Sequence, residues 1–193
     1  MVKKAVGFRR PQWLIVFTLI FLAFLSTEAL GKEHTYQSKL VTIHYNDEHL
    51  LEEFEEKIRP SSFTYALNTI FLGESGTSQD ASLGEFVDTL FKRVQQILGM
   101  PQPSLRVNIK LLKDQKDVSW TWASITGKPT KAPAFYWKKT NTIYLQPQEL
   151  STGILAHEMA HATIDHYFVI RPPSKIAEML CEYVDKEISS QPF

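Results

Sequence analysis

The segment His157-Glu158-Met159-Ala160-His161 carries the pattern H-E-x-x-H, and the interpretation of the whole chain starts from it. If the segment is helical, the two histidines lie four positions apart on one face, about 6 Å apart along the axis. That spacing lets both imidazoles bind one tetrahedral zinc ion. Glu158 then lies beside the metal, where a general base can take a proton from zinc-bound water. A third protein ligand would leave one position open, as a catalytic zinc site requires.

The residues around this motif decide whether it is more than a coincidence, because short motifs also occur by chance. The predicted helix is apolar on both sides of the motif, at Ile154, Leu155, Met159, Ala160 and Ala162. Such a helix is expected to be buried, and buried polar side chains need partners. A zinc ion is the simplest common partner for this set, so the segment favours a zinc site.

The third ligand is expected from a second helix, which the sequence predicts from residues 172–174 to about Ile188. Glu178 falls early in this helix, where its side chain can reach a metal on the facing helix. Glu182 lies one turn later on the same face and is the other candidate. We expect Glu178 to be the ligand and Glu182 to support a ligating histidine through a hydrogen bond.

The rest of the chain predicts alternating strands and helices. Strands are predicted at residues 40–45 and 105–112, and residues 134–137 and 142–146 predict a hairpin. Helices are predicted from Asn46 or Asp47 to Ile58 and from Ser82 to Leu98. Residues 113–133 contain turn-forming residues. We expect three tryptophans to pack under the sheet: Trp120 and Trp122 from this segment, and Trp137 from the hairpin. This order predicts an α+β domain.

The motif does not fit the metzincin class, which would place glycine at position 164 and histidine at position 167. The chain has Ile164 and Tyr167 there, and His166 is one residue out of frame. Residues 150–165 and 178–183 instead resemble the active-site helix and the glutamate helix of the gluzincin clan, the thermolysin-like zinc metallopeptidases. Residues 134–137 look like the substrate-binding edge strand of that clan.

This resemblance implies a set of roles for individual residues. It implies zinc ligands at His157, His161 and Glu178, and a general base at Glu158. It also implies that backbone groups of Ala134 and Phe135 pair with an extended peptide or protein substrate.

Larger gluzincins carry an oxyanion-stabilising tyrosine or histidine downstream of the glutamate helix, but only fifteen residues follow Glu178. The chain therefore looks most like the compact minigluzincins. That resemblance implies a zincin-like fold: a small mixed sheet with an edge-strand hairpin, an active-site helix and a glutamate helix. Candidates for an oxyanion partner are His166, Tyr167, Tyr136 and Tyr183, although zinc alone can polarise a carbonyl group.

Residues 1–31 predict a secretory signal peptide. Four basic residues precede an apolar run over residues 13–25, and Ala29-Leu30-Gly31 places small residues where signal peptidase cleaves. The run is shorter than the roughly 20 residues of a membrane span, so export and cleavage are expected rather than a retained anchor. Residues 32–193 are then expected to form a single domain.

Composition excludes several classes of partner and bond. The formal net charge is zero, which gives no indication of binding to nucleic acid or to an acidic membrane surface. Cys181 is the only cysteine, so no intramolecular disulfide can form, and we expect it to be a small buried side chain.

Two functions are consistent with these patterns. The first is an exported zinc-dependent metallopeptidase that hydrolyses peptide bonds. The alternative is a catalytically weak or latent zinc-containing binding or regulatory module on the same fold, for example one whose residues 189–193 block the cleft. The missing downstream subdomain motivates this alternative, because the cleft would have only one well-formed wall.

Overall fold

The structure, a computed structural model, describes residues 32–59 and 82–190. The chain divides into the units Met1–Lys32 and Glu33–Phe193, and the described elements all belong to the second. The predicted signal peptide lies outside the described residues, and so do residues 191–193. No helix in the described part of the chain is long and apolar enough to cross a membrane.

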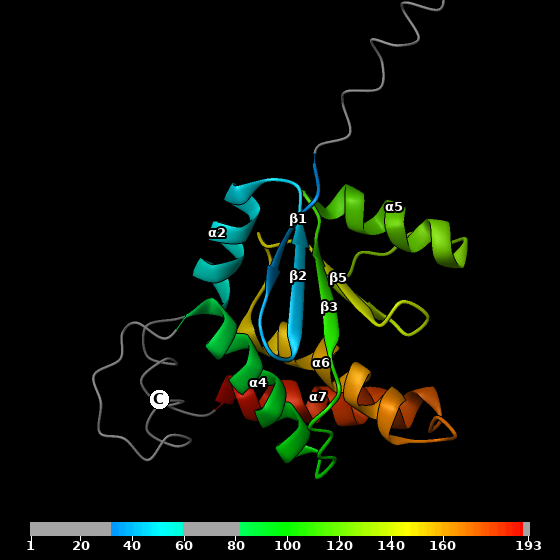
Figure 1. Ribbon diagram of the computed structural model, residues 1–193. Helices are drawn as coiled ribbons and strands as arrows, with labels where there is room; N and C mark the ends of the chain where they lie inside the picture. The colour runs from blue at the N-terminus through cyan, green and yellow to red at the C-terminus, as the bar shows by residue number, and fades with distance from the viewer. Residues whose placement is uncertain (1–31, 60–81, 191–193) are drawn as a thin grey trace, which may run out of the picture. The chain divides into compact units, whose positions relative to one another are not determined.

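A five-stranded mixed sheet forms the centre of the unit Glu33–Phe193 (Figure 1). The strands are β1 (His34–Gln37), β2 (Val41–Tyr45), β3 (Val107–Leu111), β4 (Ala134–Trp137) and β5 (Thr142–Leu145), in the order β1-β2-β3-β5-β4. Strands β2, β3 and β5 are parallel, whereas β1 and β4 are antiparallel edge strands. The predicted β4–β5 hairpin is confirmed, and β1 is an addition to the predicted strands.

The described residues form five helices: α2 (Glu48–Ile58), α4 (Leu83–Ile97), α5 (Gln115–Thr126), α6 (Thr152–Tyr167) and α7 (Ser174–Ser190). All except α5 were predicted, and three begin at the N-caps Asp47, Ser82 and Ser151, whose side chains accept backbone N–H groups. Strands, helices and their order confirm the α+β class.

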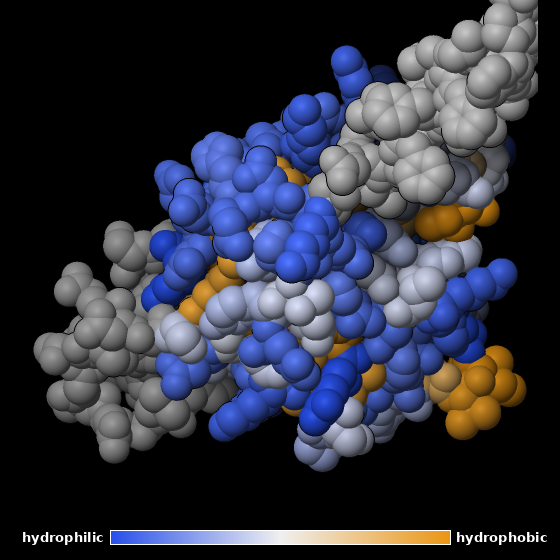
Figure 2. All heavy atoms as spheres, turned by 45° about the horizontal axis from the view of Figure 1, so that its top comes forward, coloured by the Kyte–Doolittle hydropathy of each residue, from blue (hydrophilic) through white to orange (hydrophobic). Residues whose placement is uncertain are grey.

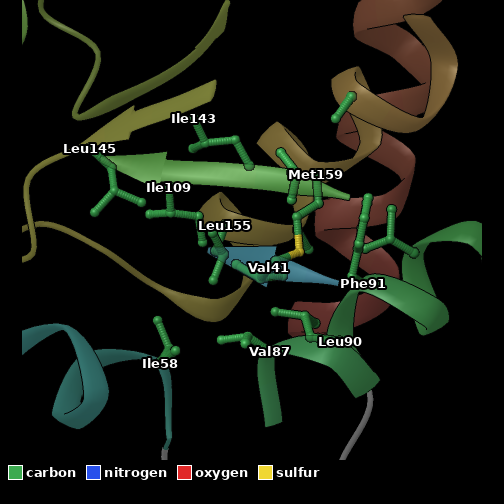
Figure 3. Close-up of a cluster of buried hydrophobic side chains, with 14 of the residues drawn as sticks. Val41, Ile58, Val87, Leu90, Phe91, Ile109, Ile143, Leu145, Leu155 and Met159 are labelled. Atoms are coloured by element: carbon green, nitrogen blue, oxygen red, sulfur yellow. The ribbon is translucent and has the colours of Figure 1, made fainter. Parts of the chain in front are cut away.

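Every second residue of the central strands faces one apolar core, as the alternation of a pleated strand requires. Helices α2, α4 and α6 cover this face, and their side chains meet those of the strands in Figure 3. The buried set includes Val41, Ile109, Ile143, Leu145, Ile58, Val87, Leu90, Phe91, Leu155 and Met159. Burying each such side chain contributes about 1.5–3 kcal/mol, so α6 is held firmly along its face with Leu155 and Met159.

Helices α6 and α7 pack side by side (Figure 1). They run antiparallel, because Gly153 in the first turn of α6 lies against Asp185 and Ser189 near the end of α7. A Cβ atom at position 153 would collide with the side-chain oxygens of both residues, so glycine permits this close approach. The pairing presents one face of α7 to the histidines of α6.

Helix α5 lies apart from this layer (Figure 1) and contacts the opposite face of the sheet. The ring of Trp122 meets that of Phe135 edge-on at 5.0 Å between centroids, and Phe135 in turn stacks on Tyr144. Trp122 therefore packs against the sheet as predicted. The same prediction is wrong for Trp120, whose residue surface is 79% exposed.

The buried Asp88 on α4 ties the turn between β1 and β2 to the helix layer. Its carboxylate accepts hydrogen bonds from Ser38 Oγ at 2.6 Å, Lys39 N at 3.0 Å and Leu40 N at 2.9 Å. Asp88→Ala is expected to lower the free energy of unfolding by about 3 kcal/mol, because it leaves buried donors without an acceptor. Urea unfolding measures the change.

The matched control for this substitution is Asp117→Ala, at an exposed position in the first turn of α5. It is expected to change the stability by less than about 0.5 kcal/mol. Equal effects of the two substitutions would show that the hydrogen bonds of Asp88 contribute nothing specific.

Candidate metal centre

Helix α6 places the two histidines of the motif together. The helix begins after Ser151, whose hydroxyl accepts the N–H of Ile154, and ends where Phe168 adopts an extended conformation. The rings of His157 and His161 lie 5.0 Å apart between centroids. Their side chains are 22% and 12% exposed, so both are largely buried but still reach the solvent.

Helix α7 adds a carboxylate to this pair. Glu178 Oε2 lies 3.6 Å from His157 Nε2 and 3.5 Å from His161 Nε2. Donor atoms about 2.0–2.2 Å from a tetrahedral zinc ion are themselves about 3.3–3.5 Å apart. Glu178 Oε2 thus already lies at nearly the distance from each histidine nitrogen that a shared metal ion would impose.

Cys181 is a further donor, and the sequence interpretation assigned it no role beyond packing. Its sulfur and one ring nitrogen each of His157 and His161 all lie within 4.8 Å of one another, a cluster that could hold a metal ion. Cys181 follows Glu178 by three positions, so both lie on the same face of α7, and this spacing was the signal available in the sequence. Burial raises the pKa of the thiol, and the nearby carboxylates of Glu178 and Glu158 raise it further.

Glu158 lies next to the cluster and is buried, with 8% of its surface exposed. Burial raises the pKa of this carboxyl to about 8, although a hydrogen bond from the backbone N–H of Tyr136 opposes the shift. The Glu178 carboxylate raises the pKa further. The hydrogen bond joins α6 to strand β4, so the carboxyl group is fixed between the histidines and the sheet edge.

His161 has the properties of a neutral metal ligand. Burial lowers its pKa to about 4, and the nearby His157 and Arg171 lower it as well. Its Nδ1 atom is buried and has no hydrogen-bond partner among the described residues. Glu182 is exposed, and no hydrogen bond joins it to this nitrogen, so its supporting role stays a prediction.

A second buried carboxylate, Asp165, lies one turn after His161 on α6. Arg171 Nε lies 2.8 Å from its Oδ1 atom, and Lys138 Nζ lies 3.9 Å from the same atom. These contacts tie the connection between α6 and α7 to the hairpin. Burial and the Asp165 carboxylate raise the pKa of Tyr136, whose hydroxyl group donates a hydrogen bond to Asn141.

The remaining oxyanion candidates lie on α6 and α7. Tyr167 and Tyr183 are 48% and 50% exposed, and His166 Nδ1 lies 2.9 Å from the carbonyl oxygen of Ala162. These positions do not single out one residue, and the oxyanion role stays a prediction for all of them.

Strand β4 is an edge strand whose outer side has no strand partner within the described residues. Gln146 N donates to Pro133 O, and antiparallel pairing alternates, so the backbone groups of Phe135 are directed toward its partner Tyr144. Those of Ala134 and Tyr136 then face outward, and the Tyr136 N–H is the one that meets Glu158. The outward backbone groups beside the cluster therefore belong to Ala134 and Tyr136.

Comparisons of this chain with protein-family models, curated proteins and solved structures find no match. The functional assignment therefore depends on the residues and distances given above. They establish an α+β fold whose cluster of His157, His161 and Cys181 could hold a metal ion.

The pKa of Glu158 makes a prediction for the metal-free protein. A carboxyl group with a folded pKa of about 8 and an ordinary value of 4.5 stabilises the fold below pH 4.5 and loses this contribution as the pH rises to 8. His161 acts in the opposite direction, but only between pH 4 and 6.5. Between pH 6.5 and 8 the wild type should therefore lose about 2 kcal/mol relative to Glu158→Gln, at about 1.4 kcal/mol per pKa unit.

Urea unfolding of both proteins in chelator, at pH 6.5 and 8, measures this difference. Because the two proteins share every other titrating group, those contributions cancel in the comparison. Parallel stability changes in both proteins would mean that Glu158 ionises normally in the folded state.

Proposed function

We propose that this chain is an exported zinc-dependent metallopeptidase of the compact gluzincin type, with His157, His161 and Glu178 as zinc ligands. The observation that supports it best is the position of Glu178 Oε2, at 3.5–3.6 Å from both histidine Nε2 atoms. Two imidazoles and one carboxylate form a donor set found in hydrolytic zinc sites. The sheet with its antiparallel edge strand beside α6 agrees with the zincin-like fold.

In this proposal Glu158 transfers the proton. Zinc, when bound, would acidify a water molecule and polarise the scissile carbonyl group. The Glu158 carboxylate accepts a proton from the attacking water and later donates it to the leaving amine. Its raised pKa in the metal-free protein suits a group that must both accept and release a proton near neutral pH. The Tyr136 N–H orients the carboxylate during both steps.

Strand β4 and helix α7 would bind the substrate. An extended peptide can pair with the outward backbone groups of Ala134 and with the carbonyl oxygen of Tyr136, whose N–H is bound to Glu158. The backbone groups of Phe135 hold the strand on the sheet. On α7, Ile176 and Met179 flank Glu178 and are 45% and 56% exposed, which supplies an apolar rim beside the metal. The face shown in Figure 2 is mostly hydrophilic, with apolar side chains exposed only at separate places.

A latent or weakly active module on the same fold remains the second candidate, and Cys181 is the observation that favours it. A fourth protein donor beside the histidines can fill the position that a hydrolytic site leaves open.

Metal analysis and digestion of a peptide library test the proposed function together. The purified chain is expected to contain about one zinc ion per chain, and chelator is expected to remove both metal and cleavage. Adding zinc back should restore cleavage. A protein that holds zinc but cleaves no peptide would support the latent module, and a protein that holds no metal would exclude both functions.

A further inference from the structure

The four donors at the α6–α7 interface are one more than a hydrolytic zinc site uses. His157 and His161 come from α6, and Glu178 and Cys181 come from α7. Glu178 already lies close to both histidines, at 3.5–3.6 Å. The sulfur of Cys181 adds a soft donor that lies within 4.8 Å of one ring nitrogen of each histidine.

The position of Cys181 differs from that of a cysteine that only fills the core. Its backbone lies on the buried side of α7, next to Ala177 and Val184, but its sulfur clusters with polar metal-binding atoms. A thiolate sulfur and an imidazole nitrogen on one tetrahedral zinc ion are about 3.6 Å apart. The present separation from a ring nitrogen of each histidine is at most 4.8 Å, so a shift of at most about 1.2 Å brings the sulfur to that distance.

We propose that Cys181 is a fourth protein ligand of the metal ion bound by His157 and His161, and that it closes the site. The inference rests on the proposed metal site. On binding, the S–H bond breaks, the sulfur bonds to the metal, and the proton and the displaced water leave to the solvent. The closed site has four protein donors, as structural zinc sites do, and it cannot act on a peptide until the sulfur is released.

This donor set also predicts which metals the site prefers. Thiolate favours zinc and softer ions over magnesium, calcium or manganese, which prefer oxygen donors. Removing Cys181 should therefore weaken zinc binding, by about tenfold or more, the scale of loss when a supporting group of a metal site is removed.

Cobalt substitution of the full chain tests the proposal independently of catalysis. Tetrahedral Co²⁺ gives visible absorption bands, and a thiolate ligand adds a charge-transfer band in the near ultraviolet. The wild type is expected to show both, whereas Cys181→Ser and Cys181→Ala should keep the visible bands and lose the near-ultraviolet band. Val184→Ala, a buried change one turn further along α7, is the control and should keep both.

A second measurement tests whether the thiolate closes the site. Cleavage of a peptide library per bound zinc is expected to rise about tenfold or more in Cys181→Ala, as when a closed state populated at roughly 90% is removed. Unchanged cleavage per bound zinc would overturn the closure. Visible bands without the near-ultraviolet band in the wild type would overturn the ligand assignment but leave the peptidase proposal intact. Failure of every variant to bind cobalt would instead overturn the metal site itself.

Discussion

Replacing Glu158 with glutamine is expected to abolish peptide cleavage while the metal stays bound. Glutamine keeps the shape of the side chain and can still accept the N–H of Tyr136, but it cannot take up the proton of the attacking water. Loss of a general acid–base group lowers the rate by about 10²–10⁴-fold. The fall should appear in kcat, because the substrate still meets the same metal and the same strand edge.

The experiment compares steady-state cleavage and zinc content for wild type, Glu158→Gln and Glu149→Gln. Glu149 is exposed and lies before α6, so its substitution controls for loss of one carboxylate in this region. Full activity in Glu158→Gln with zinc present would exclude Glu158 as the proton-transferring group.

Replacing His161 with alanine is expected to abolish metal binding. The substitution removes a donor that lies on the buried side of the site, so water cannot easily take its place. The affinity for zinc should fall by more than the 10–100-fold that loss of an outer-shell partner costs. Zinc at a thousandfold excess over its Kd raises the free energy of unfolding of the wild type by about 4 kcal/mol, and this gain should vanish in the variant.

Metal analysis measures the loss of zinc binding. Thermal unfolding with and without added zinc measures the loss of stabilisation by zinc. His166→Ala is the matched control, because His166 lies on the same helix but is exposed and outside the donor cluster. Equal stabilisation of wild type and His161→Ala by zinc would place the metal elsewhere.

The elements that form the site could be predicted from the sequence because each has a strong local signal. Ser151 marks the start of α6, and a proline pair precedes α7. Helical periodicity then places His157 and His161 on one face. Both histidines contact Glu178 because helices α6 and α7 pack together. The two helices are consecutive in sequence and joined by a short connection, so their packing could be predicted.

The parts that were missed have weak or misleading local signals. Helix α5 buries only Val118, so it shows no apolar periodicity, and its N-cap Asp114 was interpreted as part of a turn. Strand β1 is mostly exposed along His34–Gln37 and forms only through pairing with β2. The role of Cys181 depends on the direction of its sulfur, which an apolar helical pattern does not reveal.

The placement of all four donors between His157 and Cys181 has a consequence for the order of events during synthesis. The ribosome completes all five strands of the sheet before it adds the first metal ligand. The strands, α2 and α4 are therefore synthesised before any residue of the proposed metal site, and their pairing can begin without a metal ion, unlike the folding of a zinc finger. A nascent chain that has reached α6 but not Glu178 presents two histidines and no carboxylate partner. Under the proposed function, the set of metal donors is therefore completed only after every strand of the sheet has been synthesised.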